Sequence, residues 1–149
     1  MKKQKRIWIA LFLALTLILI LSGCNGNGLP KTAKINITFD PNPVPYDTEY
    51  EEGWLYNVIL TESNGVGVTL TSIKFDAYGQ QEQFLGTIIW DEEDIIERFK
   101  SSYLPAFSAL SCWFYQSEAE RKYDIYTVTG IDDNGNPIEA TGRIDFLPQ

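Results

Sequence analysis

Apolar and polar side chains alternate along most of the chain beyond residue 33, and this period of two restricts the fold more than any other feature. Residues 34–39, Lys-Ile-Asn-Ile-Thr-Phe, show it most clearly. Alternation places every second side chain on one face of an extended strand, whereas a helix needs a period near 3.6. We expect strands at residues 34–39, 54–62, 69–78, 84–90, 107–116, 123–131 and 138–146. About seven short strands at this spacing predict an all-β antiparallel sandwich.

Residues 91–100, Asp-Glu-Glu-Asp-Ile-Ile-Glu-Arg-Phe-Lys, interrupt the alternation and predict one short helix. Asp91 can cap the first backbone N–H groups, and the acids that follow favour the positive end of the helix dipole. Three apolar residues fall on one side at helical spacing, namely Ile95, Ile96 and Phe99. The acids at 91–94 raise the alternative of a metal site, but adjacent helical side chains point away from a common centre. A solvated helix start is the favoured interpretation.

The N-terminus has the layout of an export signal. The first six residues carry four positive charges, and residues 7–21 are apolar apart from Thr16. This run is short for a membrane-spanning helix, which needs about 20 apolar residues, and it fits the apolar region of a signal peptide. The apolar run stops at Leu21, Ser22, Gly23 and Cys24, and the small residues before this cysteine allow a peptidase to reach the backbone.

This four-residue motif resembles the lipobox of bacterial lipoproteins. The resemblance implies that the Cys24 thiol receives a diacylglyceryl group, that residues 1–23 are removed, and that Cys24 becomes the new N-terminus. Two or three acyl chains anchor a protein stably, where one chain is marginal. An uncleaved anchor helix is the alternative, and in both cases the remainder is exported and held at a membrane of the bacterial cell envelope. Residues 24–33 are then a flexible lipidated tether, ahead of a sandwich domain at 34–149.

The chain has two cysteines and no histidine, which narrows its chemistry. If Cys24 is acylated, Cys112 has no partner inside the domain, and we expect it to be a small buried hydrophobic residue. A nucleophilic thiol would need a histidine base, which the chain lacks. No Ser-His-Asp or Cys-His set can be assembled. Paired acids for glycoside hydrolysis stay open by counting, since the chain has 20 acids, but a domain this small rarely houses such a cleft alone. We therefore expect no enzymatic activity, no cofactor and no metal site.

The chain is acidic, with a formal net charge of −8 and a pI near 4.5. Removal of residues 1–23 leaves 8 basic and all 20 acidic residues, a formal charge of −12. A surface of this sign repels nucleic acid, so that class of partner is excluded. At residues 132–136, Asp-Asp-Asn-Gly-Asn, the Asn-Gly pair predicts a hairpin turn. A calcium loop is the alternative there, although its alternating acids and distal glutamate are missing.

Three stretches are similar to bacterial immunoglobulin-like and fibronectin III-like surface modules. Residues 54–72, Trp-Leu-Tyr-Asn-Val-Ile-Leu-Thr-Glu-Ser-Asn-Gly-Val-Gly-Val-Thr-Leu-Thr-Ser, resemble the early strands, and residues 104–107 and 129–136 resemble later ones. The resemblance spans about residues 33–147 and implies two antiparallel sheets in a protein that spaces, stiffens or binds. Two features depart from it: there is no cysteine pair between sheets, and Phe107 stands where glycine would be expected.

Together these features predict a non-enzymatic, lipid-anchored envelope or cell-surface protein with an immunoglobulin-like module for binding, adhesion or assembly. A carbohydrate-binding module is the alternative, because sugars stack on flat rings and 13% of the residues are aromatic. Its candidate stacking residues are Trp54, Trp90, Trp113, Tyr115 and Tyr126. An inhibitor or accessory subunit of an envelope enzyme is a third possibility. The protein or carbohydrate ligand is not identified by the sequence.

Overall fold

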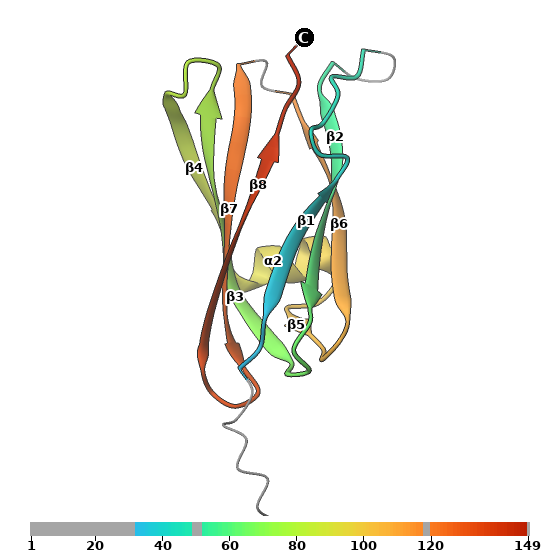
Figure 1. The fold of residues 1–149 in the computed structure, drawn as a ribbon, viewed down its shortest axis with the longest axis vertical. Coiled ribbons are helices and arrows are strands. Elements are labelled where there is room, and N and C mark those ends of the chain that lie inside the picture. Colours follow the sequence, from blue (N-terminus) through green and yellow to red (C-terminus); the bar gives the residue numbers. More distant parts are fainter. Residues whose placement is uncertain (1–31, 49–51, 118–119, 149) are drawn as a thin grey trace, which may run out of the picture.

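The computed structural model describes residues 32–48, 52–117 and 120–148, which form a two-sheet antiparallel sandwich with one short helix (Figure 1). Its elements are β1 (Ile35–Asp40), β2 (Trp54–Glu62), β3 (Val68–Gly79), β4 (Phe84–Trp90), α2 (Glu92–Phe99), β5 (Tyr103–Leu104), β6 (Ala109–Gln116), β7 (Arg121–Asp132) and β8 (Pro137–Asp145). One sheet has the order β1-β2-β6, and the other has the order β4-β3-β7-β8 with β5 paired to β3. The predicted all-β antiparallel sandwich is confirmed.

The predicted N-terminal segments fall almost entirely outside the described residues. These are the signal peptide at 1–23, including Leu21, Ser22 and Gly23, and the tether at 24–33 up to residue 31, including Cys24. Their roles stay predictions. Within the part of the chain that is described, no helix is both long and apolar enough to cross a membrane.

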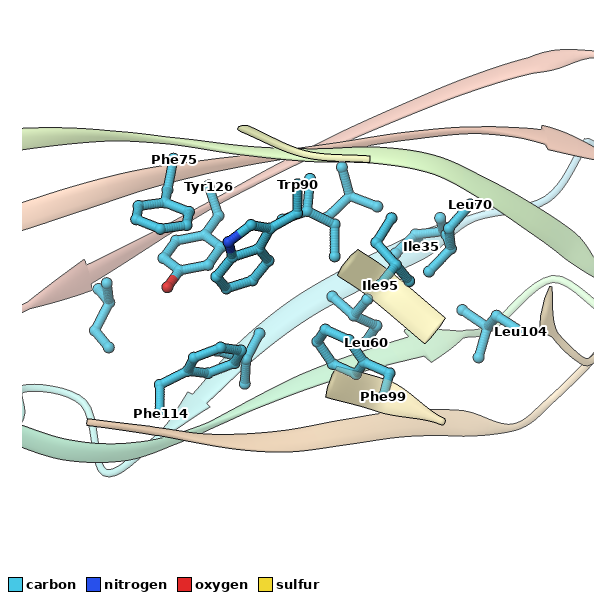
Figure 2. Packing of buried hydrophobic residues seen from close by; sticks show 14 of the residues in the cluster. Ile35, Leu60, Leu70, Phe75, Trp90, Ile95, Phe99, Leu104, Phe114 and Tyr126 are labelled. Carbon is cyan, nitrogen blue, oxygen red and sulfur yellow. The ribbon is translucent and has the colours of Figure 1, made fainter. Parts of the chain in front are cut away.

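The alternation in the sequence decides which face of each strand enters the core. In β2, every second side chain from Trp54 to Leu60 is buried, and the intervening ones are exposed or half-buried. The period-two faces of the predicted strands place seven residues in the core, and all are buried, namely Val58, Leu60, Ile73, Phe75, Val128, Ile144 and Phe146. Figure 2 shows the aromatic part of this core, where Phe75 and Tyr126 stack at 5.1 Å between ring centroids.

Helix α2 lies between β4 and β5, which both belong to the larger sheet, and the chain enters the other sheet at β6 (Figure 1). The Asp91 carboxylate accepts two N–H groups of the first turn, while the Asp94 side chain accepts the N–H of Asp91, which forms a capping box. Ile95 and Phe99 are buried in the core (Figure 2). Ile96 lies at the edge of the same apolar arc, about 100° from Ile95, and it is 46% exposed, so only two of the three predicted residues enter the core.

A buried carboxylate at the end of β2 orders the neighbouring loops. The Glu62 side chain accepts backbone N–H groups from Lys34, Asn64, Gly65 and Phe107, at 3.1, 2.7, 2.8 and 3.0 Å. Burial would raise the pKa of Glu62, but these donors outweigh it and lower the pKa to about 2. The sequence analysis did not single out Glu62, because a lone acid at a strand end carries no local signal of burial.

Phe107, which stands where glycine was expected, has a left-handed backbone with φ of 54°. Its N–H is held by Glu62, and its ring lies over Gly65, where an added Cβ would come within 2.5 Å of the ring. The left-handed turn is therefore stabilised by contacts and not by glycine. It also explains why β6 begins at Ala109, two residues later than predicted.

Two polar pairs lie within the sandwich. Arg121 and Asp124 form an ion pair at 2.7 Å, with both side chains at most 3% exposed. The hydroxyl groups of Tyr56 and Tyr126 lie 3.0 Å apart and share a hydrogen bond. Burial raises the pKa of Tyr56 to about 12, although the bond to Tyr126 opposes this. Both pairs are neutral overall at ordinary pH, which limits the cost of placing polar groups in a core.

The turn predicted at residues 132–136 joins β7 to β8 as a hairpin. The Asp132 carboxylate accepts the backbone N–H groups of Ala33, Asn134 and Asn136. Burial would raise the pKa of Asp132, but the bonds from Asn136 and the other donors lower it. Within the described ranges, no group of three or more histidine, cysteine, aspartate or glutamate side chains is placed to hold a metal ion.

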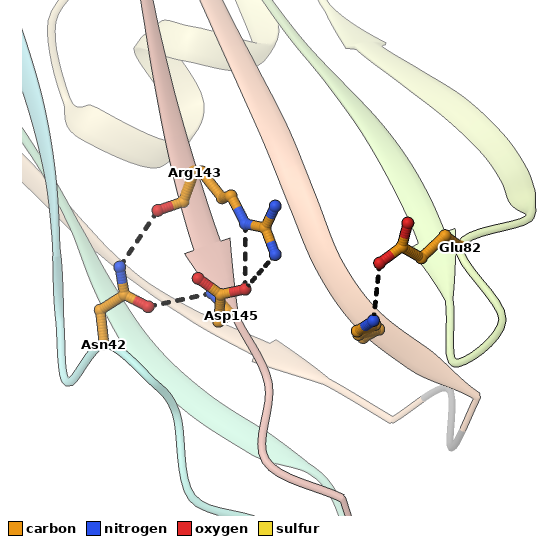
Figure 3. Close-up of polar contacts among 5 residues, drawn as sticks. Asn42, Glu82, Arg143 and Asp145 are labelled. Atoms are coloured by element: carbon orange, nitrogen blue, oxygen red, sulfur yellow. Dashed lines mark hydrogen bonds and ion pairs between the residues drawn. The ribbon is translucent and has the colours of Figure 1, made fainter.

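One long side of the sandwich, where β1 meets β8, is bridged by hydrogen bonds. The Asn42 amide donates to the carbonyl of Arg143 at 3.1 Å and accepts the N–H of Asp145 at 2.9 Å (Figure 3). Gly142 brings the strands together, because a Cβ there would lie 2.9 Å from the Cβ of Ile37. Nearer the start of β1, a groove of about 510 Å³ separates the strands, and Lys34 and Glu139 are among its lining residues. We call this surface the bridged side.

Candidate interaction surface

The other long side of the sandwich is formed by the remaining edge strands, β4 and β6. Neither strand has a charged residue: β4 reads Phe-Leu-Gly-Thr-Ile-Ile-Trp and β6 reads Ala-Leu-Ser-Cys-Trp-Phe-Tyr-Gln. Every other described strand longer than two residues has at least one charged side chain. We call this surface the uncharged side. It contrasts with a chain in which acidic residues outnumber basic ones by 20 to 12.

Large apolar side chains are exposed on both of these strands. On β4, Phe84 is 59% exposed, Ile88 45% and Ile89 61%. On β6, Trp113 is 61% exposed and Tyr115 43%. Because consecutive strand residues face opposite sides of a sheet, the exposure of both Ile88 and Ile89 means that β4 is uncovered on both faces. Apolar exposure gathered on two adjacent edge strands is typical of an interaction surface.

A groove of about 230 Å³ lies between β4 and β6, and helix α2 contributes to its wall. Its lining includes Ile88 and Trp90 from β4, Phe114 and Tyr115 from β6, and Arg98 from α2. Trp90 and Phe114 stack across the two sheets, with ring centroids 4.9 Å apart and an interplanar angle of 16°. Figure 2 shows this pair facing across the sandwich. The groove is therefore aromatic at its base and has one cation at its wall.

Arg98 is held against these rings and not against an acid. Its guanidinium carbon lies 4.5 Å from the Trp90 ring centroid and 5.8 Å from that of Phe114. Such cation–π contacts leave the N–H groups at the edge of the guanidinium free to bind an acceptor. Among residues 32–48, 52–117 and 120–148, Arg98 forms no ion pair. A ligand with a carbonyl or anionic group could therefore bind here.

The three tryptophans considered for ligand stacking do not lie together. Trp54 is completely buried and donates its indole N–H to the carbonyl of Leu147, and Trp90 is only 6% exposed. Tyr126 is also buried. The hypothesis that Trp54 and Trp90 are exposed for stacking on a ligand was wrong, because the core of a thin sandwich contains its largest rings. Trp113 alone among the three is exposed.

Trp113 and Tyr115 present a pair of rings on the outer face of β6. They are two residues apart, so their side chains leave the strand on the same face. Leu55 of β2 is paired with Tyr115 in the ladder and is 48% exposed. The Tyr115 hydroxyl donates to the carbonyl of Glu52 at 2.9 Å, which fixes the ring. Sequence reasoning named both aromatics, but their exposure depends on which face of β6 meets the core.

Cys112 is half-buried and packs against the core, as a small hydrophobic residue would. Burial raises the pKa of its thiol, and the charges of Arg98 and Lys100 oppose this only partly. A thiol with a raised pKa is mostly protonated at neutral pH and is a weak nucleophile.

The uncharged side was not predicted, although the sequence shows one of its two features, the lack of charge in both strands. Residues 84–90 and 109–116 contain no charged side chain, which can be read directly from the chain. The sequence does not show that these two segments are neighbouring edge strands, because the order of strands in a sheet depends on contacts between distant segments. The role of Arg98 at the groove was missed for the same reason.

Comparisons with known proteins give no family for this chain. No protein-family model matches it, and no curated protein matches it. Among solved structures, it is 12% identical to the putative ApaA protein from Bordetella pertussis, covering 80% of this chain and 98% of that one with a TM-score of 0.49. It is 10% identical to a structural genomics target called SoR45, covering 80% and 90% with a TM-score of 0.49. Likeness at this level carries no information on function.

The CARDB domain of the PF1109 protein from Pyrococcus furiosus, solved in complex with di-metal ions, is a third similar structure. The two are 15% identical, the match covers 78% of this chain and 89% of that one, and the TM-score is 0.35. The metal ions are a property of that protein.

Proposed function

We propose that this protein is a non-enzymatic, lipid-anchored binding module of the bacterial cell envelope, with an immunoglobulin-like sandwich as its exposed domain. The lipobox-like motif that ends at Cys24 supports the anchor, and the two-sheet antiparallel architecture supports the module. The absence of histidine from the whole sequence and the raised pKa of the Cys112 thiol speak against nucleophilic catalysis.

The observation that carries the binding role is the uncharged side. An exported domain with a formal charge of −12 keeps its surface hydrated and repels copies of itself and anionic lipid. An uncharged strip with six large exposed apolar side chains, Leu85 included, therefore costs solubility unless a partner covers it. The strip includes an open groove with Arg98 at its wall, which gives a partner both an apolar and a polar contact.

The anchor is tested by mass spectrometry of the protein isolated from a bacterial host that processes lipoproteins. We expect an N-terminus at Cys24 with attached acyl chains. Cys24→Ser should abolish acylation, and Cys112→Ser is the matched control that should retain it. An intact Met1, or an unmodified Cys24, would contradict the proposal.

The binding role is tested with a photo-crosslinking amino acid placed at single exposed positions in cells. Thr87 on β4 and Ser111 on β6 probe the uncharged side, and Thr141 on β8 is the matched control on the bridged side. We expect crosslinked products at the first two positions and few at Thr141. Equal yields at all three positions would remove the uncharged side as the binding surface.

A carbohydrate ligand is a second candidate, favoured by the exposed rings of Trp113 and Tyr115 on one face of β6. Flat rings that share a face can stack on successive sugar units. Soluble envelope polysaccharides should then quench or shift the tryptophan fluorescence. Because Trp54 and Trp90 are buried, Trp113→Ala should abolish the response. A response that survives Trp113→Ala would exclude this site. An inhibitor or accessory subunit of an envelope enzyme stays a prediction that no observation favours.

A further inference from the structure

The outer edge of β4 lacks most of the features that keep a free strand from pairing with another chain. Natural edge strands are protected by charges, prolines, bulges or covering segments. β4 has no charge and no proline, and in the described chain it pairs only with β3. Its one irregularity is at Leu85, which is skipped where the pairing with β3 shifts. Residues 86–90 are left as a regular, uncharged segment with a free edge.

We propose that the β4 edge pairs antiparallel with the β4 edge of a second copy of this chain, so that the two larger sheets become continuous. Identical edges related by a two-fold axis are self-complementary when they run antiparallel, and this closes the assembly at two copies. Each copy contributes backbone donors and acceptors along residues 86–90 and covers the exposed Ile88 and Ile89 of the other. This inference goes beyond the proposed function and does not depend on the lipid anchor.

Charge favours a second copy at this strand over contacts elsewhere. Two domains of formal charge −12 repel each other, and this repulsion is weakest where a strand has no charge of its own. The other edge of the same sheet, β8, has Glu139, Arg143 and Asp145 and begins with Pro137. Those charges and the proline keep β8 from pairing with another chain, and β4 has neither.

Charge also selects the antiparallel direction. At one end of β4 lies the acidic start of α2, with four acids at residues 91–94. At the other end lies the turn at residues 80–83, which has three glutamines and one acid, Glu82, whose carboxylate is paired with Lys122 at 2.8 Å (Figure 3). Antiparallel pairing places the acidic end of one copy beside the neutral end of the other. Parallel pairing would place eight acids together, which is unfavourable.

The geometry predicts which residues meet. Residues 86–90 are centred on Ile88, so symmetric pairing over the whole segment places Thr87 of one copy opposite Ile89 of the other. Both lie on the outer face of the sheet, because their partners on β3 are Asp76 and Lys74. A disulfide between these positions should therefore form only between one copy with a cysteine at residue 87 and another copy with a cysteine at residue 89.

The test uses the full chain in detergent, in a Cys112→Ala background, so that Cys24 is the other thiol. Copies with Thr87→Cys are mixed with copies with Ile89→Cys and oxidised, and the products are read by mass on a non-reducing gel. We expect the mixed dimer to exceed either dimer of like copies. Ile131→Cys, at an exposed position on β7, is the control and should give no dimer. The Cys112→Ala protein without an added cysteine can form a disulfide dimer only through an unacylated Cys24. Such a dimer would contradict the lipid anchor and would leave the pairing of β4 unaffected.

A second variant separates pairing from folding. Ile89→Glu places a carboxylate opposite Lys74 in the ladder, which should preserve the fold by a cross-strand ion pair. It also places a charge on the pairing edge, so the mass in solution should fall from dimer to monomer. Ile131→Glu should stay dimeric. A parent chain that is monomeric at every concentration, a dimer that survives Ile89→Glu, or crosslinks only between like copies would overturn the proposal. So would crosslinking of Thr87→Cys to a different protein or within its own chain.

Discussion

The two sheets of this sandwich are joined in different ways along its two long sides. On the bridged side, the Asn42 amide binds two backbone groups of β8, and Gly142 allows β1 and β8 to approach closely. On the uncharged side, the sheets meet through the stacked rings of Trp90 and Phe114, beside an open groove. The bridged side has polar and charged residues that tolerate water. The uncharged side has apolar residues that do not, and we propose that the first side closes the fold and the second binds a partner.

The strongest way to break both sides at once is to charge the core that they share. Leu60 of β2 is completely buried, so Leu60→Asp should cost several kcal/mol of a stability of only about 5–15 and unfold the domain. Leu55→Asp is the matched control on the same strand, because Leu55 is 48% exposed. Its stability should change by less than about 1 kcal/mol. Thermal unfolding followed by circular dichroism compares the two, and equal losses would contradict the assignment of the faces of β2.

Acid should weaken the loops at the end of the sandwich where Glu62 lies. The pKa of Glu62 is lowered from an ordinary value of 4.5 to about 2, so its stabilising effect is complete above about pH 5 and is lost as the pH falls towards 2. The shift corresponds to about 3 kcal/mol. Denaturant unfolding at a series of pH values measures it.

Glu62→Gln is the control for this pH dependence. The carboxamide cannot titrate, so the variant should be less stable at pH 7 and should lose less stability on acidification. Asp132, whose pKa is also lowered, titrates in both proteins and cancels in the comparison. Parallel pH curves for the two proteins would show that Glu62 is not the source.

Two glycines, one on each side, sharpen the comparison between the sides. A Cβ at Gly142 would lie 2.9 Å from the Cβ of Ile37, whereas a Cβ at Gly86 on β4 would meet nothing within 4 Å. Gly142→Val should therefore cost about 1–3 kcal/mol through overpacking. Gly86→Val should be neutral or slightly stabilising, because valine suits a strand. If both variants lose the same stability in chemical denaturation, the two sides do not differ in packing.

Local pattern was sufficient to predict the elements of this fold. Alternation predicted each strand longer than two residues, and it identified core residues such as Leu60 and Phe75. Asp91 and the following acids predicted the start of α2, whose capping box the structure contains. These successes share a cause, because strand faces and helix caps depend on residues within a few positions of one another.

The candidate site depended on contacts that local pattern does not encode. Trp54 and Trp90 were placed among possible surface rings, but the core contains both. Strand β5 has only two residues, so it is too short to show the alternation from which the other strands were predicted. The partnership of β4 and β6 follows from sheet order. Arg121 and Asp124 are only three residues apart in β7, but the burial of both depends on what packs against that strand. Such features require the positions of segments that are far apart in the chain.

Hydrogen–deuterium exchange on the intact protein tests the central claim most directly, because it compares the two sides in one measurement. Peptides that cover β4 and β8 are followed at low and at high protein concentration. If the uncharged side is where the protein associates, exchange in residues 84–90 should slow as concentration rises, while exchange in residues 137–145 should not change. Ile89→Glu should remove the concentration dependence. Exchange in residues 84–90 that is the same at every concentration, or that slows equally in both strands, would contradict the account.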